Sequence, residues 1–72
     1  MNTLDPSTDY YTRIARAHRA QAQASRLYAF AYGLESSESS QHLANTCRES
    51  AAAYDQMAEA AEARSTRTEV TA

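Results

Sequence analysis

The chain of 72 residues lacks lysine and tryptophan and contains one cysteine, one proline and one glycine. The lone Cys47 cannot form a disulfide within the chain, and no cysteine and histidine cluster has the spacing of a zinc site. We therefore expect no cofactor and no metal. No apolar run approaches the roughly 20 residues of a membrane span, and no signal-peptide pattern is present. These absences predict a cytoplasmic protein with no membrane partner.

Large aliphatic side chains are also scarce, because the apolar fraction of 43% consists mainly of alanine. A chain of this length buries only about 60% of the surface that its unfolded form exposes. Alanine adds little buried area per residue, so a lone hairpin has difficulty offsetting its conformational entropy. With neither a disulfide nor a metal to help, we expect the chain to form an oligomer, most simply a dimer.

Proline and glycine mark where the helices begin and end. Asp5 followed by Pro6 is typical of an N-cap with proline at the first helical position. Gly33 suits the left-handed position of a Schellman ending, with Leu34 folding back onto the helix. The punctuation therefore predicts a first helix that ends at this glycine.

A second helix can be capped by Ser36 or Ser37. The sequence thus predicts a single domain with a helix over about 6–32, a turn over 33–36, a second helix over about 37–64 and a frayed tail over 65–72. A loop this short makes neighbouring helices antiparallel. The fold class is all-α, an antiparallel two-helix hairpin that we expect to dimerise into a four-helix bundle. The alternative is one continuous helix that ignores Gly33.

In size and layout this hairpin resembles the ROP-type hairpin, which dimerises into a four-helix bundle. The resemblance is one of architecture, because no residue motif carries it. It implies an oligomeric state but no function.

Helical periodicity predicts the residues through which the helices pack. Alanine recurs along both helices and allows two backbones to approach closely, while larger side chains fill the ends and edges. The predicted dimer and core seam consists of Tyr10, Ile14, Ala17, Ala24, Leu27, Tyr28, Ala31, Leu43, Cys47, Ala51, Tyr54 and Ala58.

Charge divides between the two helices. Residues 10–34 carry four arginines and no acidic residue, whereas residues 35–64 carry six acidic residues and two arginines. Antiparallel helices of opposite charge attract along their edges. Each exposed pair contributes only about 0–1 kcal/mol. The larger effect we expect is on orientation and register.

Arginine and aromatic side chains on the first helix are the candidates for binding a partner. We predict a surface that comprises Arg16, Arg19, Arg26, Tyr11, Phe30 and Tyr32. Half-buried tyrosine suits an interface, since it offers apolar area and a hydroxyl group. The alternatives are that the arginines are solvated or face the partner helix, and that tyrosines merely cap the alanine core.

No residue pattern indicates catalysis. Glu38 and His42 lie one turn apart, but two ligands are too few for a metal site. Cys47 lies on the apolar stripe of the second helix, and His42 is rotated off its face, so no base activates the thiol. We expect no enzyme.

Three functions remain. The first is a small regulatory or inhibitor protein, encoded by a phage or plasmid, that acts by protein–protein binding. The second is a ROP-like dimer that binds RNA or DNA through its arginines. The third is a structural or chaperone-like subunit of a larger assembly. The first fits an acidic chain without motifs best.

Overall fold

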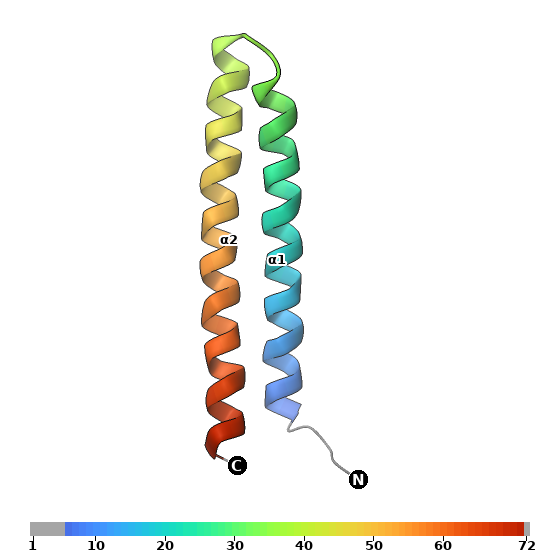
Figure 1. Cartoon of the computed structure of the whole chain (residues 1–72), viewed down its shortest axis with the longest axis vertical. Coiled ribbons are helices and arrows are strands. Elements are labelled where there is room, and N and C mark those ends of the chain that lie inside the picture. Colours follow the sequence, from blue (N-terminus) through green and yellow to red (C-terminus); the bar gives the residue numbers. More distant parts are fainter. Residues whose placement is uncertain (1–5, 72) are drawn as a thin grey trace.

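A computed structural model describes the backbone of residues 6–71 and the side chains of residues 10–65. Two helices, α1 (Pro6–Gly33) and α2 (Glu38–Thr71), lie antiparallel and side by side, joined by a short loop (Figure 1). The predicted all-α hairpin is therefore confirmed. Asp5, the predicted N-cap, lies outside the described residues. None of the described helices combines the length and the apolar character needed to cross a membrane.

The loop is held by side chains at the start of α2. Ser37 caps this helix, because its hydroxyl accepts a hydrogen bond from the backbone N–H of Ser40 at 3.1 Å. The Ser40 hydroxyl donates to Glu35 Oε1 at 2.6 Å. Gln41 Nε2 donates to the carbonyls of Gly33 and Glu35 at 3.1 and 2.6 Å. The beginning of α2 therefore satisfies backbone groups that the end of α1 and the loop leave free.

Gly33 ends α1 in a different way from the Schellman motif that we predicted. No glycine among the described residues has a positive φ. The last turn instead tightens: Leu34 N–H donates to Ala31 C=O at 3.3 Å, and Glu35 N–H donates to Tyr32 C=O at 3.2 Å. Leu34 is 73% exposed and does not fold back onto the helix. The prediction was wrong because these shorter bonds satisfy the last carbonyls without a left-handed residue.

The second helix is longer than predicted and continues to Thr71. Ser65, where we expected fraying to start, is buried at 8% exposure, and its hydroxyl lies 3.1 Å from that of Thr12 on α1. Neither glycine nor proline follows Ser65. The helix therefore has no signal to end there and keeps its register against α1.

Alanine forms the contact between the helices. Buried positions recur every seven residues on each helix, as in an antiparallel coiled coil. They are Ala15, Ala22 and Ala29 on α1, and Ala44, Ala51, Ala58 and Ser65 on α2. Between them lie the half-buried side chains of Tyr11, His18, Ser25 and Tyr32 on α1 and of Cys47 and Tyr54 on α2. Ser40 and Ala61 of α2 are also buried. We call this set the alanine seam.

The stripe that we predicted for the first helix does not form this contact. Its members Tyr10, Ala17, Ala24, Leu27, Tyr28 and Ala31 are exposed, and Ile14 is half-buried. On α2 the predicted positions Ala51 and Ala58 are buried, Cys47 and Tyr54 are half-buried, and Leu43 is exposed. An alanine seam brings the backbones so close that Leu27 and Tyr28 cannot fit between them, and they lie outside. A role for the exposed stripe in pairing two copies stays a prediction.

Candidate functional site

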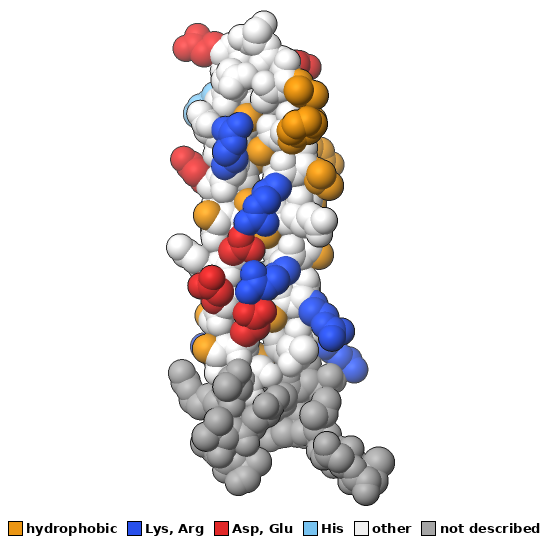
Figure 2. Space-filling model, viewed as in Figure 1, with side chains coloured by type: hydrophobic (Ala, Val, Ile, Leu, Met, Phe, Trp, Pro, Cys, Tyr) orange, Lys and Arg blue, Asp and Glu red, His pale blue; other side chains and the backbone are white. Residues whose placement is uncertain are grey.

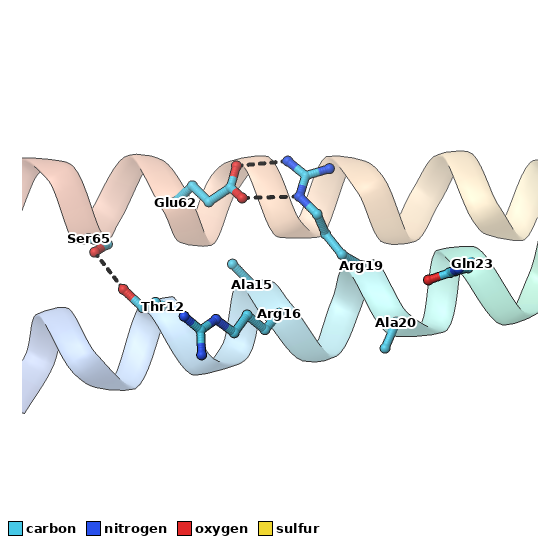
Figure 3. A pocket seen from close by; sticks show the side chains of 8 residues that line it. All are labelled: Thr12, Ala15, Arg16, Arg19, Ala20, Gln23, Glu62 and Ser65. Carbon is cyan, nitrogen blue, oxygen red and sulfur yellow. Dashed lines mark hydrogen bonds and ion pairs between the residues drawn. The ribbon is translucent and has the colours of Figure 1, made fainter.

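Ion pairs bridge the two helices along one side of the hairpin (Figure 2). Arg19 binds Glu62 through two hydrogen bonds, from Nε at 3.1 Å and from Nη2 at 2.8 Å (Figure 3). Arg19 Nη1 also lies 3.5 Å from Asp55, which pairs in turn with Arg26. Two of the arginines predicted to bind a partner are therefore engaged by the neighbouring helix. We call this side the ion-pair flank.

The bidentate pair changes the acidity of both groups. The hydrogen bond from Arg19 lowers the pKa of the Glu62 carboxyl below its ordinary value. The same bond, with the charges of Glu62 and Asp55, raises the pKa of Arg19. Both side chains are about half exposed, so solvent screens the attraction. The pair serves register more than stability.

Arg16 lies one turn before this pair, at the edge of a shallow groove. The groove is lined by Thr12, Ala15, Arg16, Arg19, Ala20, Gln23, Glu62 and Ser65. Figure 3 shows the Arg16 guanidinium beside α1, directed away from the carboxylate of Glu62. Arg16 is exposed and takes no part in the inter-helix ion pairs described above.

Tyr11 and Tyr32, also predicted to bind a partner, are half-buried at the edge of the alanine seam. The Tyr11 ring meets Tyr10 edge-on at 5.2 Å and lies under the guanidinium of Arg64, 5.5 Å from it. The Tyr32 ring stacks on that of Tyr28 at 6.4 Å. These contacts within the hairpin make both rings part of its packing.

Phe30 belongs to a group of exposed apolar side chains near the loop. Leu27, Phe30 and Leu34 are 65%, 68% and 73% exposed. A spacing of three residues places Leu27 and Phe30 on one side of α1, and Leu34 directly follows the end of the helix. Leu27 lies about 200° around the helix from the buried Ala29. Figure 2 shows apolar side chains gathered along the outer edge of α1 at the loop end. We call these three residues the apolar patch.

The side of the hairpin away from the ion pairs carries no charge over most of its length. Tyr28 lies two residues after Arg26 and Met57 two residues after Asp55, so each is turned by about 200° from the ion-pair flank. His18 of α1 stacks on Tyr54 of α2 at 6.4 Å on this side. The uncharged flank comprises residues 10, 14, 17, 21, 24, 28 and 31 of α1 and residues 43, 47, 50, 54, 57 and 61 of α2.

A groove opens on the uncharged flank at the end remote from the loop. It is lined by Tyr10, Tyr11, Ile14 and His18 of α1 and by Met57, Ala60, Ala61 and Arg64 of α2. Ile14 packs on the buried cluster of Ala15, Ala58 and Ala61. Met57, which is not among the residues of the predicted seam, is 48% exposed.

The described part of the chain offers few side chains for metal binding or thiol chemistry. Within it, no three histidine, cysteine or acidic side chains lie close enough to share a metal ion. Glu38 and His42 are both exposed. Cys47 is free and half-buried.

Comparison with known proteins identifies no relative, so the function has to be argued from the surfaces described above. No protein-family model, no curated protein and no solved structure matches the chain.

Proposed function

We propose that the chain is a small non-enzymatic regulatory or inhibitor protein that acts by protein–protein binding, as a homodimer whose four helices form a bundle. The observation that carries the proposal is the apolar patch. Three large side chains at least 65% exposed, gathered at the loop end of α1, are costly to leave in water. Binding a target would remove them from it. From the residue composition we place the protein in the cytoplasm of a cell that carries the phage or plasmid encoding it.

The surroundings of the apolar patch support a protein target. Phe30 also lines a second groove, between the helices on the ion-pair flank, together with Arg26, Arg48, Asp55 and Glu59. An apolar centre beside a polar rim is the usual anatomy of a protein interface. The Phe30 ring would be the anchor, because large rigid side chains contribute most of the energy at such sites.

Nucleic-acid binding is the weaker candidate. A ROP-like reader would use a row of free arginines on its first helix to contact phosphates. Arg19 and Arg26 are held instead by Glu62 and Asp55, and these carboxylates would repel a phosphate backbone.

Affinity capture from an extract of the source organism tests the proposal. The baits are the wild-type chain, a patch variant carrying Leu27→Glu and Phe30→Glu, and a control carrying Ala20→Glu and Gln23→Glu. All four positions are exposed on α1, so each bait is expected to fold, which circular dichroism checks. We expect quantitative mass spectrometry to show a protein retained by the wild type and the control and depleted at least tenfold with the patch variant. Equal capture by all three baits would rule out the apolar patch as the target site.

A further inference from the structure

The hairpin alone buries very little apolar volume. Among the described residues, no side chain larger than alanine is fully buried, and the buried set is seven alanines and two serines. Burial stabilises by about 0.8 kcal/mol per CH₂ group. A core built of methyl groups therefore leaves most of the hairpin's larger apolar side chains outside.

The shape of the chain points the same way. Its Cα radius of gyration is 16.4 Å, whereas a compact domain of this length has one of about 11 Å. Its accessible surface is 5419 Å², about 1,000 Å² more than a compact protein of 7.9 kDa exposes. In an interface of standard size each partner buries about 800 Å². One such interface would bring the exposed surface close to that of an ordinary folded protein.

Charge selects the face. The ion-pair flank carries Arg19, Arg26, Asp55 and Glu62, which would lose water if another chain covered them. The uncharged flank carries one charged neighbour, Arg64, which lines the groove at the end remote from the loop and lies over the Tyr11 ring. The small residues of this flank, among them Ala17 and Ala24, let backbones approach closely. Covering this flank costs the least desolvation.

Shape selects the orientation. Tyr28 and Leu43, which are 61% and 43% exposed, protrude near the loop. The groove between Tyr10, Ile14 and Met57 lies at the opposite end of the same flank. Two copies related by a twofold axis, with their loops at opposite ends, place the protruding side chains of each copy against the groove of the other. With both loops at the same end, protrusions would face each other.

We infer that a second copy of this chain docks on the uncharged flank, antiparallel to the first, with Tyr28 and Leu43 of each copy entering the groove of the other. The inference rests on the proposed pairing of two copies and names the face that pairs. It leaves the apolar patch free for a target.

Sedimentation equilibrium over a range of chain concentrations tests the face. Tyr28→Glu and Met57→Glu place a charge on the uncharged flank, while Leu27→Glu and Gln56→Glu place one on the neighbouring exposed position of the same helix. We expect a wild-type dimer whose dissociation constant rises at least 100-fold in the first two variants and less than threefold in the last two. A wild-type monomer at about 100 μM, or an equal effect of all four variants, would overturn the inference.

Distance measurement between spin labels tests the orientation. A label at Ser36→Cys marks the loop of each copy in a Cys47→Ser background, which sedimentation must first show to dimerise as the wild type does, because Cys47 lies on the docking flank. The 28 residues of α1 span about 42 Å, so the antiparallel dimer separates the labels by about 40 Å or more. A separation below about 20 Å would overturn the antiparallel docking.

The two proposals fail independently. Leu27→Glu is expected to keep the dimer and lose the target, whereas Tyr28→Glu is expected to lose the dimer. If the wild-type chain is a monomer and the patch variant still loses the target, the target-binding proposal stands and the docking is refuted.

Discussion

At the scale of single residues, the pair of Arg19 and Glu62 makes a prediction about acidity. Because Arg19 lowers the pKa of Glu62, this carboxyl should titrate below the usual range for glutamate in an NMR titration. Arg19→Gln should move its pKa back up, while Arg16→Gln, one turn away and outside the pair, should leave it unchanged. Since the folded-state pKa is lowered, the pair stabilises above the unfolded-state pKa and is lost as pH falls through the folded-state value. If the pKa of Glu62 were the same in Arg19→Gln as in the wild type, the pairing would be contradicted.

Gly33 makes a second prediction at this scale, because its backbone is helical and not left-handed. A Cβ built at this position would meet only the Arg48 guanidinium, at an ordinary contact distance of 3.6 Å. Gly33→Ala should therefore stabilise the hairpin by about 0.5 kcal/mol, mainly by restricting the unfolded chain. Urea denaturation measures the change. A loss of stability above about 1 kcal/mol would indicate the left-handed ending that the sequence first suggested.

At the scale of the helices, the alanine seam should tolerate no increase in side-chain size. Ala22 is fully buried against α2, so Ala22→Leu should push the helices apart and destabilise by about 1–3 kcal/mol. Ala20→Leu is the control, because Ala20 is exposed and directed away from α2 (Figure 3). Alanine and leucine have similar helix propensities, so the control should change stability by under about 0.5 kcal/mol. Equal effects of the two substitutions in urea denaturation would disprove the seam on α1.

The same helices show how far the sequence predicts the structure. Helix number, the Ser37 cap and the antiparallel layout follow from local signals that one chain carries. The packing face of α1 does not, because alanine recurs every seven residues in two registers about 200° apart, one containing Ala22 and the other Ala24. The predicted register is the one flanked by Leu27 and Tyr28, which we expected to fill the edges of the contact. The structure uses the other register and leaves both side chains exposed.

The residues of the candidate site also differ in whether one helix alone is enough to predict their position. Phe30 is exposed, as a binding residue must be. Its exposure could be predicted from its position on its own helix. The engagement of Arg19 and Arg26 depends on which α2 residues lie opposite, and hence on the register between the helices. Opposite net charges predicted attraction but not the particular pairs. The exposed position of Met57 likewise depends on how the two helices are rotated about their axes.

At the scale of the whole molecule, a thin hairpin with a core of alanine should not unfold as an independent monomer does. If two copies pair before either is stable, unfolding and dissociation are one transition, and its midpoint rises with chain concentration. A tenfold increase should raise Tm by about 5 °C for a dimer of this size. Thermal unfolding followed by circular dichroism between about 5 and 500 μM measures the slope. Tyr28→Glu should lower Tm and abolish the slope, whereas Leu27→Glu should preserve it. A wild-type Tm independent of concentration would mean that the alanine seam alone holds the fold, and that the uncharged flank is free in solution.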